Sequence, residues 1–507
     1  MGPVVTVTDL RIIWPQLSLA VFLLALLVVD LLDKRGETTT AGLFTFLAAT
    51  VTGAFVAVQW WSGASGAMGI AFSDMVIVDA FSLVFCGIFC AALGITALNS
   101  IRVLPRDGYN YSEYYVLLMG ATLGMMFMAT ANSLLMVFVG IETLSISLYA
   151  LCGFARQRRE SNESALKYLL LGSFATGFLL YGIALIYGST GTIVFTSGSA
   201  TGTVNTLQNF IGGFDSVAEI PLTLKMGLLL MFVGLLFKAS VFPFHSWAPD
   251  VYQGAPTAVT GFMSTAAKAA AFAVLVRVLF IFQEMSDIWR PLLYVLAILT
   301  MTVGNVTAIT QTNVKRMLAF SSIAHAGYLL VAILAWNELG IAAIMFYLVA
   351  YTLMNLGAFG VLAALSRGDK QNADLASLAG ASKKYPFLAA MMAIFMFTLA
   401  GIPPMAGFVG KFMIFAAAVQ TAVTHTGSGM YPLVIIGVAN AVVSVYFYLR
   451  VIVVMYMNEP AEEIESVPAN PWGGLALVLC AAGIIIIGLL PARFLDVVAQ
   501  SISIVVH

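Results

Sequence analysis

Long apolar runs separated by short polar connections fill nearly the whole chain. A bilayer core about 30 Å thick needs ~20 consecutive apolar residues per helix, and runs of that length recur from end to end. The pattern predicts an all-α, polytopic membrane protein of about fourteen transmembrane helices. Their expected positions are 13–33, 41–61, 76–99, 114–132, 134–154, 166–188, 222–247, 256–281, 291–310, 317–336, 339–365, 385–420, 431–457 and 472–491.

Composition supports this interpretation and excludes a sizeable aqueous domain. Of the 507 residues, 61% are hydrophobic and 9% are charged, and the mean hydropathy is +0.98. Soluble globular domains carry about 25% charged residues. The formal net charge of -1 leaves no basic surface for nucleic acid, so the expected surroundings are the lipid bilayer and other membrane proteins.

The basic residues are distributed unevenly between the connections. Thirteen lie in the odd-numbered connections, and only Arg277 and Arg290 lie beside an even-numbered one. Cytoplasmic loops are enriched in Lys and Arg, so the odd connections are expected to face the cytoplasm of a bacterial inner membrane. Both termini, and the Gly/Ser/Thr-rich loop from Ser189 to Pro221, are then expected on the periplasmic side. The thirteen are Lys34, Arg35, Arg102, Arg106, Arg156, Arg158, Arg159, Lys315, Arg316, Arg367, Lys370, Lys383 and Lys384.

No cofactor motif is recognisable. The four cysteines, Cys86, Cys90, Cys152 and Cys480, lie in apolar runs without the spacing of a zinc, haem or iron–sulfur site. No glycine-rich nucleotide-binding pattern follows a strand. The chain itself is therefore expected to hold no metal, redox group or nucleotide.

Four ionisable residues lie near the centres of predicted helices: Glu142, Lys238, Lys268 and Lys411. A charge at mid-membrane costs about 2.5–3.5 kcal/mol on insertion scales, and such residues usually face the protein interior or water. One interpretation is structural, with Glu142 paired to Lys238 and the other lysines held by backbone carbonyls. Three lysines against one glutamate leave charge uncompensated, which favours a functional role.

Lysine chemistry suggests what that role is. A desolvated ammonium releases its proton more readily than an exposed one, and a nearby carboxylate restores the charged form. A change in the distance between Glu142 and Lys238 would therefore switch Lys238 between holding and releasing a proton. This hypothesis requires the two side chains to lie on facing surfaces.

Two further residues are secondary candidates. His325 titrates in a useful range and could link lysine sites, although a core histidine satisfied by hydrogen bonds explains it equally well. Lys167 lies near the basic end of its helix, where a lysine can snorkel to the interface.

Two helices are expected to be broken inside the membrane. Pro243 follows Lys238, while Gly401, Pro403 and Pro404 precede Lys411. Proline removes a backbone donor, and a break at membrane depth is tolerated only against protein or a water-filled cavity. The breaks fall in helices 7 and 12, at matching places in two consecutive five-helix blocks, as in inverted-repeat transporters. The expected organisation is residues 1–112 (helices 1–3), 113–283 (first repeat), 284–457 (second, inverted repeat) and 458–507 (cytoplasmic loop and helix 14).

Three motifs resemble a known family. They are FKASVFPFHSWAPDVYQGAPTAVTGFMSTAAKAAAFAVLVR at 237–277, NVKRMLAFSSIAHAGYLL at 313–330 and FTLAGIPPMAGFVGKF at 397–412. They look like subunit N of the proton-pumping NADH:quinone oxidoreductase, respiratory complex I, an antiporter-like membrane subunit. Lysine rather than glutamate at position 411 argues against subunit M, and the chain ends soon after helix 14, without the long lateral helix of subunit L.

The resemblance implies a proton channel with assigned positions. Glu142 matches the family's helix-five glutamate, Lys238 the helix-seven lysine, Lys268 the central lysine and Lys411 the exit-side lysine. Lys167 also matches a family lysine, and His325 falls on the polar axis between the half-channels. NAD, FMN, iron–sulfur clusters and quinone are then expected in partner subunits of complex I.

Two alternatives remain open. A subunit of a multi-subunit sodium/proton antiporter would share the fold and the buried lysines, but would have no redox partner. A scaffold subunit would use its buried charges only for pairing. A photosynthetic relative of complex I that takes electrons from ferredoxin also remains open.

Overall fold

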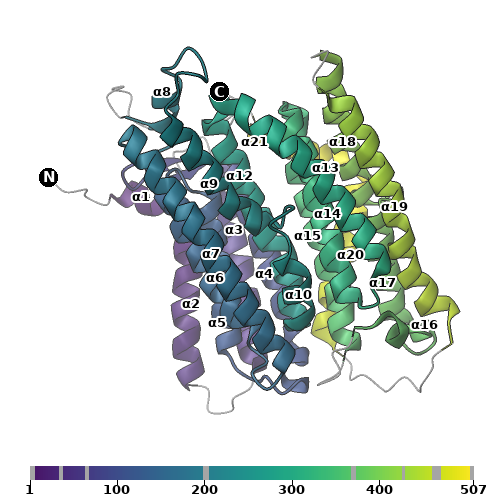
Figure 1. The fold of residues 1–507 in the computed structure, drawn as a ribbon. Coiled ribbons are helices and arrows are strands. Elements are labelled where there is room, and N and C mark those ends of the chain that lie inside the picture. The colour runs from purple at the N-terminus through teal and green to yellow at the C-terminus, as the bar shows by residue number, and fades with distance from the viewer. Residues whose placement is uncertain are drawn as a thin grey trace.

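Long helices packed side by side form almost the entire structure (Figure 1). The computed structural model describes residues 6–32, 38–62, 68–197, 205–366, 373–424, 429–459 and 470–502. The long helices are α2 (Trp14–Leu32), α3 (Thr38–Trp61), α4 (Ala80–Arg106), α5 (Glu113–Ala129), α6 (Leu134–Cys152), α7 (Arg159–Thr190), α9 (Leu222–Ala239), α12 (Lys268–Ile281), α13 (Ser286–Thr310), α14 (Val314–Ala335), α15 (Glu338–Leu365), α17 (Pro386–Ala400), α18 (Ala406–Thr424), α19 (Met430–Met457) and α20 (Pro471–Leu489). The shorter elements are α1 (Val7–Ile12), β1 (Gly69–Ala71), β2 (Val76–Val78), α8 (Leu207–Ile211), α10 (Trp247–Gly254), α11 (Thr257–Phe262), η2 (Met263–Ala267), η3 (Gln283–Met285), η4 (Leu375–Leu378), α16 (Ala381–Lys384) and α21 (Pro491–Ile502).

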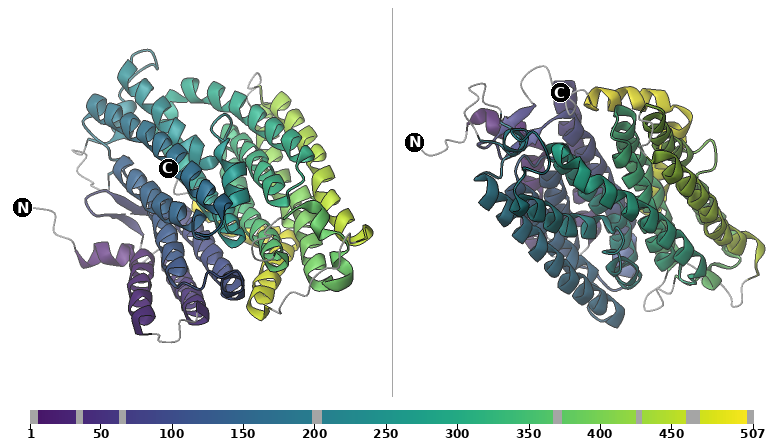
Figure 2. Two further views of the ribbon diagram at one scale, coloured as in Figure 1. Left: turned by 60° about the horizontal axis from the view of Figure 1, so that its bottom comes forward. Right: turned by 45° about the horizontal axis from the view of Figure 1, so that its top comes forward.

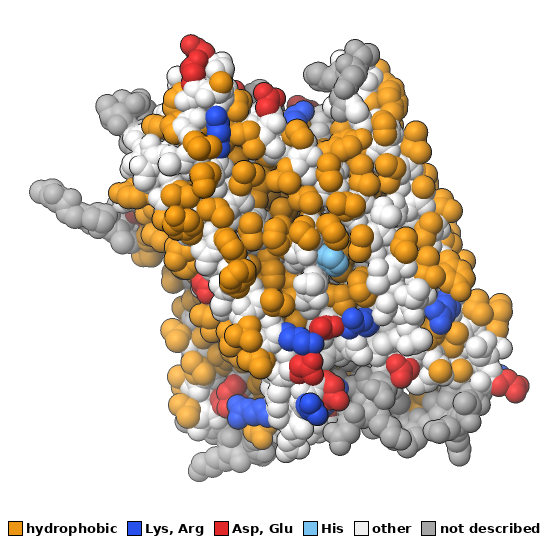
Figure 3. All heavy atoms as spheres, viewed as in Figure 1, with side chains coloured by type: hydrophobic (Ala, Val, Ile, Leu, Met, Phe, Trp, Pro, Cys, Tyr) orange, Lys and Arg blue, Asp and Glu red, His pale blue; other side chains and the backbone are white. Residues whose placement is uncertain are grey.

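The predicted membrane architecture is confirmed. Within the described residues, thirteen helices are long and apolar enough to cross a membrane, counting α11, η2 and α12 as one continuous span. The apolar helix α5 is only slightly shorter, and α17 continues into α18 across a break. Counting α5, and taking α17 with α18 as one crossing, gives the fourteen crossings that the sequence predicts. Hydrophobic side chains cover the middle of the face in Figure 3, and charged side chains gather toward its two ends.

Several helices begin at a side chain that accepts a hydrogen bond from the first turn. Asp79 accepts from the Ser82 amide at 2.8 Å, Ser133 from the Met136 amide at 3.2 Å and Asn337 from the Gly340 amide at 2.7 Å. The first amides of a helix have no partner within the helix. Because lipid offers no hydrogen bonds, these caps fix where the helices begin.

Glycine pairs set the closest helix approaches. A Cβ at Gly182 on α7 would lie 2.6 Å from the Gly227 carbonyl oxygen on α9, and a Cβ at Gly227 would lie 2.9 Å from the Gly182 carbonyl oxygen. Gly124 on α5 and Gly140 on α6 face each other in the same way. Small residues let helix backbones approach closely where lipid provides no hydrophobic driving force, so a larger residue at Gly182 or Gly227 would separate α7 from α9.

Helices in corresponding places of the two predicted blocks pack alike. In the first block α5 lies against α6 and α6 against α7; in the second α13 lies against α14 and α14 against α15. The chain is interrupted between α9 and α10 in the first block and between α17 and α18 in the second. Both predicted breaks are therefore present, while the domain boundaries drawn from the sequence remain a prediction.

The predicted start of helix 3 at residue 76 is wrong. Val76–Val78 is the strand β2, which pairs with β1 in an antiparallel hairpin, and α4 begins only at Ala80 and continues to Arg106. Positive φ angles at Phe72, Ser73 and Asp74 make the turn. A three-residue apolar strand next to an apolar helix has no periodicity of its own, which explains the error.

A further helix, α21, follows α20 and was not predicted. It lies across the end of the bundle rather than along the helices (Figure 2). Its Phe494 ring packs edge-on against Phe346 of α15, with centroids 5.5 Å apart. The basic residues Lys34, Arg35, Arg367 and Lys370, counted in the charge bias, lie outside the described residues.

Candidate functional site

Three predicted lysines lie inside the bundle. Lys238, Lys268 and Lys411 expose only 6%, 1% and 5% of their surface. None reaches an aqueous end of its helix, so each ammonium group must be held by protein groups or by internal water. Their surroundings differ, and they follow one another from α9 through α12 to α18.

Lys238 lies in the last turn of α9, just before the first break. Its ammonium donates to the Tyr168 hydroxyl at 3.3 Å and lies 5.0 Å from the centre of the Tyr168 ring and 5.6 Å from that of Tyr149. The Trp247 indole stacks on Tyr168 and donates to the Phe237 carbonyl at 3.0 Å, which ties α10 to the end of α9. An aromatic cage with one hydroxyl acceptor therefore holds this cation.

Glu142 on α6 acts on Lys238 without touching it. The carboxylate exerts an electrostatic effect on both Lys238 and Tyr149, but of the ion pairs within 4.0 Å among the described residues none joins Glu142 to Lys238. Tyr149 lies seven residues after Glu142 and so on the same face of α6. One carboxylate oxygen of Glu142 is buried and has no hydrogen-bond partner. Glu142 and Lys238 therefore both lie near Tyr149 and are farther apart than a direct ion pair.

Lys268 joins the two predicted blocks. It begins α12 directly after the π-helical turn η2, and π-helical turns are frequent at functional sites. Its ammonium donates to the carbonyl and the hydroxyl of Ser322 on α14. The Tyr252 hydroxyl, from α10, faces both Ser322 and Ser240, the second residue after Lys238. Ser240, Tyr252 and Ser322 thus place hydroxyl groups in the region between Lys238 and Lys268, but no direct hydrogen bond connects Ser240 to Tyr252.

His325 lies near both Lys268 and Lys411, and the positive charge of each lysine acts on its ring. One ring nitrogen bonds the Tyr347 hydroxyl, and the other lies 2.9 Å from the Tyr448 hydroxyl. Tyr448 also bonds Ser321, the neighbour of the serine that holds Lys268. Both ring nitrogens of the histidine are therefore hydrogen-bonded, and its role in linking the lysine sites remains a prediction.

Lys411 lies beyond the second break. Its ammonium donates to the carbonyl oxygens of Leu399 at 2.9 Å and Ala400 at 3.2 Å, at the C-terminal end of α17. A helix C-terminus carries partial negative charge that favours a cation. Gly401 has φ +84° and packs on the Lys411 side chain. The break therefore creates the site that holds Lys411.

Lys315 is a buried residue that the sequence analysis placed wrongly in a basic connection. It is fully buried in the first turn of α14 and donates to the Ala255 carbonyl at 2.6 Å. It lies seven residues before Ser322 and therefore on the same face of α14. That spacing is visible in the sequence, but the adjacent Arg316 makes the pair resemble an ordinary interfacial anchor.

Lys167 belongs to a partly exposed ion-pair network. Its side chain is 42% exposed and contacts Glu163 at 2.8 Å and Asp250 at 2.9 Å. Arg316 contacts the other oxygen of Asp250 at 2.6 Å. Lys167 thus lies at the basic end of α7, apart from the buried lysines. The ion pairs of this network connect α7, α10 and α14 there.

Comparison with known proteins identifies the family of this chain. A family model described as NADH:quinone oxidoreductase/Mrp antiporter, TM, matches residues 131–443. NADH-quinone oxidoreductase subunit N of Trichlorobacter lovleyi is 43% identical over 499 residues, which cover 98% of each chain. Subunit N 1 of Herpetosiphon aurantiacus is 43% identical over 492 residues, covering 95% of each. The chain belongs to the NADH-quinone oxidoreductase subunit N family.

Solved structures agree with membership of the subunit N family. A chain of respiratory complex I from Thermus thermophilus superposes with a TM-score of 0.77 at 33% identity, covering 96% of this chain and 100% of that one. Chains of an archaeal membrane-bound sulfane sulfur reductase and of the Mrp complex from Dietzia sp. reach TM-scores of 0.82 and 0.81 at 24% and 19% identity. They cover 99% and 97% of this chain, and 98% and 97% of their own lengths. Identities this low show a shared fold only.

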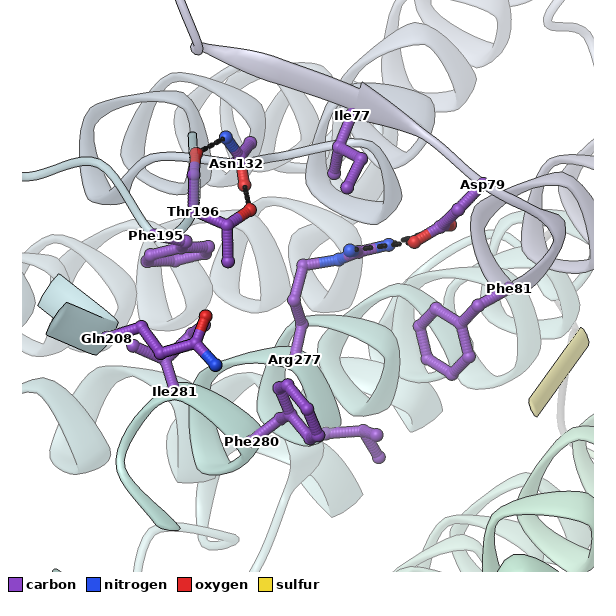
Figure 4. Close-up of a pocket in the computed structure, with 11 residues that line it drawn as sticks. Ile77, Asp79, Phe81, Asn132, Phe195, Thr196, Gln208, Arg277, Phe280 and Ile281 are labelled. Carbon is purple, nitrogen blue, oxygen red and sulfur yellow. Dashed lines mark hydrogen bonds and ion pairs between the residues drawn. The ribbon is translucent and has the colours of Figure 1, made fainter. Parts of the chain in front are cut away.

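At the far end of α12, this subunit N chain contains an ion pair that the sequence analysis did not foresee. Arg277 donates to both carboxylate oxygens of Asp79 at 3.0 Å and to the Ala129 carbonyl at 3.2 Å (Figure 4). Asp79 and Arg277 line a cavity of about 150 Å³ with Asn132, Thr196 and Gln208. Because Asp79 also caps α4, this pair ties the helix of Lys268 to α4 and α5.

The described residues of this subunit N chain offer no cluster of three or more His, Cys, Asp or Glu side chains that could hold a metal. The four cysteines are buried and unpaired. The lysine, glutamate, histidine and hydroxyl groups described above are groups that can exchange protons.

Proposed function

We propose that this chain is a proton-translocating membrane subunit of an NADH:quinone oxidoreductase, as the names of its relatives indicate. The observation that carries the proposal is the series of buried exchangeable groups that runs through the bundle, with gaps that direct hydrogen bonds do not close. Glu142, Lys238, Lys268, His325 and Lys411 follow one another in this line, and hydroxyl groups lie between them. The structural interpretation requires Glu142 to pair with Lys238, and no ion pair within 4.0 Å joins these two described residues.

Water is expected to complete the path at several buried atoms. Tyr149 Oη, Ser240 Oγ, Thr257 Oγ1, Tyr351 Oη and both amide atoms of Asn355 are buried without a hydrogen-bond partner. Buried polar groups are normally satisfied by protein or by ordered water. Tyr149 lies beside Glu142 and Lys238, and Ser240 lies beside Lys238, so these atoms mark where water would bridge the gaps in the line.

We propose that Glu142 controls Lys238 through space. The two side chains are farther apart than a direct ion pair, and approach of the carboxylate would stabilise the protonated lysine. Withdrawal of the carboxylate would release the proton toward Ser240 and Tyr252. Lys411, held by the end of α17, is then the exit-side group.

Lys167 receives a different role. We propose that its network with Asp250 and Arg316 positions α7 against α10 at the basic end of the bundle. NAD, FMN, iron–sulfur clusters and quinone are assigned to partner subunits of the complex, because the known relatives are subunits of an NADH-quinone oxidoreductase.

We further propose a multi-pass arrangement in a bacterial inner membrane with both termini on the periplasmic side. The four native cysteines are buried, so an introduced cysteine can be labelled selectively. With a membrane-impermeant maleimide added to intact spheroplasts, Asn209→Cys on α8 should be labelled and Gln157→Cys, between α6 and α7, should be labelled only after lysis. The reverse pattern would invert the topology.

The assembly is tested first. The protein is extracted from its native membrane in mild detergent, intact complexes are separated, and the band that contains it is assayed for NADH-dependent quinone reduction. Co-migration with that activity in a large flavin- and iron-containing complex supports the proposal. Migration in a smaller complex without flavin would favour the sodium/proton antiporter alternative.

The relay is tested by a matched pair of substitutions on one helix. Lys238→Ala should impair proton pumping coupled to quinone reduction while the complex still assembles. Lys225→Ala removes a partly exposed lysine from the other end of α9 and should leave pumping unchanged. Full coupled pumping in Lys238→Ala and in Glu142→Ala would instead support the scaffold alternative.

A further inference from the structure

Lys411, unlike Lys238, has no carboxylate nearby on the described helices around it. The helices that pack most closely against α18 are α14, α15, α17, α19 and α20, and the only acidic residue on them is Glu338 at the start of α15. Tyr347 of α15 packs against Gly410, the residue before Lys411. Glu338 lies nine residues before Tyr347 and so ~14 Å farther along α15. The charged form of Lys411 must therefore be stabilised by neutral groups.

One of these neutral groups is an aromatic ring. The ammonium of Lys411 donates to the carbonyl oxygens of Leu399 and Ala400, and a lysine ammonium carries three donors. The ring of Tyr328 on α14 lies in a further direction, with its centre 5.5 Å from Lys411 Nζ. A cation within about 6 Å of a ring centre is attracted by the negative face of the ring. Because Tyr328 is only 1% exposed, water weakens this attraction little.

The Tyr328 ring is held in place from three sides. Its hydroxyl accepts a hydrogen bond from Asn305 Nδ2 on α13 at 3.1 Å, and the same amide nitrogen donates to Asn440 on α19 at 3.3 Å. The rings of His325 and Phe415 pack nearly perpendicular to it, with centroids 5.7 Å and 6.1 Å away. Groups locked by their neighbours hold a site in its productive geometry, so the ring is fixed beside the ammonium before any proton arrives.

The other ionisable side chains around this ammonium supply no negative charge while they keep their protons. His325 on α14 is hydrogen-bonded at both ring nitrogens, to the hydroxyls of Tyr347 on α15 and Tyr448 on α19. Helix α17 carries no ionisable side chain, and α20 carries only the buried Cys480. The ring face of Tyr328 and the carbonyl oxygens at the end of α17 are therefore the groups that stabilise the charged lysine.

We propose that Tyr328 is a positioning residue whose ring face holds the ammonium of Lys411 and thereby sets the pH above which this lysine no longer carries a proton. The inference rests on the proposed function of Lys411 as the exit-side proton carrier. A ring attracts the ammonium but not the neutral amine, so a weaker ring face lets the proton leave at lower pH. The rings of Tyr149 and Tyr168 lie beside Lys238 in the same way, so both lysines next to the helix breaks are held against tyrosine rings.

The test weakens the ring face while it nearly preserves the size of the side chain. In the intact complex, Tyr328 is replaced by phenylalanine, by a monofluorinated phenylalanine or by a trifluorinated one. Fluorine withdraws electron density from the ring face and so weakens its attraction for a cation. The complex is reconstituted in vesicles, and proton uptake per NADH oxidised is measured against pH. The trifluorinated variant should lose pumping at a pH about one unit lower than Tyr328→Phe, as expected for loss of a desolvated cation–π contact, and the monofluorinated variant should lie between them.

Two controls separate this inference from the proposed function. Trifluorinated phenylalanine at position 320 weakens the Phe320 ring beside Arg316 and should leave the pH profile unchanged, because arginine does not release its proton in proteins. Lys411→Met should stop coupled pumping at every pH, and full pumping in that variant would refute the proposed function itself.

The inference alone is overturned by either of two results in a complex whose Lys411→Met variant does not pump. One is the same pH profile for Tyr328→Phe and its fluorinated forms, which would show that the ring face does not act on the lysine. The other is a complete loss of pumping in Tyr328→Phe, which would make the hydroxyl rather than the ring the functional group.

Discussion

Replacing Lys268 by methionine separates proton transfer from structural support. Methionine is unbranched and similar in length, so Lys268→Met keeps most of the packing in this 1%-exposed site and removes only the exchangeable group. The lysine bridges the two predicted blocks through Ser322. If protons pass along the line of buried groups, this single change interrupts it at its centre.

The expected effect on stability is small because two terms oppose each other. The variant protein loses the two charge-assisted hydrogen bonds that the ammonium donates, each worth about 1.5–3 kcal/mol. The protein no longer buries a charge at membrane depth, which recovers about 2.5–3.5 kcal/mol. The net loss of stability lies between about -0.5 and about 3.5 kcal/mol, and the complex should still assemble. Proton transfer loses a positioned carrier, which typically costs ~10²–10⁴-fold in rate.

The assay compares assembly, quinone reduction and pumping in one preparation. The intact complex is purified, its subunit content is measured, and it is reconstituted in vesicles with a dye that reports the pH gradient. Lys268→Met should show normal subunit content and strongly reduced proton uptake per NADH oxidised. Lys225→Met, the same change at a partly exposed lysine, should match the unmodified complex.

A second substitution distinguishes charge from proton exchange. Arginine keeps the positive charge but does not release its proton in proteins, so Lys268→Arg should also fail to pump. Normal pumping in Lys268→Met, or restoration of pumping by Lys268→Arg, would refute the proposed role of this lysine as a proton carrier.

Three other predictions follow from packing and pairing. Asp79→Asn removes the carboxylate charge that is paired with Arg277 inside the protein, and breaking such a buried pair typically costs about 3–5 kcal/mol. The variant complex should therefore lose activity at a lower temperature when it is heated in detergent. Unchanged thermal stability would show that the pair is solvated. Gly182→Leu should prevent assembly because its Cβ would clash with α9. Gly177→Leu, on the same helix α7 but with no atom within 4 Å of its Cβ, should assemble normally. The amount of complex in the membranes reports the assembly of each variant. We take Lys315, a fully buried lysine seven residues before Ser322 on α14, as a further candidate proton carrier. Lys315→Met should then reduce pumping more than stability, judged by dye response and subunit content, and full pumping would exclude Lys315 as a carrier.

Much of the fold could be predicted from the sequence because lipid restricts the choices. Apolar runs of sufficient length must be helices, since no other open structure satisfies its backbone in a bilayer. The breaks at Pro243 and at Pro403 and Pro404 follow from the same rule, because a missing donor has no substitute in lipid. The hairpin β1–β2 and the helix α21 were not predicted because they lie at the aqueous end of the bundle, where lipid does not restrict the backbone.

Within the candidate site, the sequence by itself determined which residues are anomalous, and only the tertiary structure decided how they relate. Glu142, Lys238, Lys268 and Lys411 stand out because a charge in an apolar run is costly wherever the helix lies. Which of them meet depends on helix contacts between distant parts of the chain, such as Lys268 with Ser322. Lys315 shows the limit most clearly: its sequence position suggests a basic loop, but the packing of α14 against the Ala255 carbonyl buries it completely.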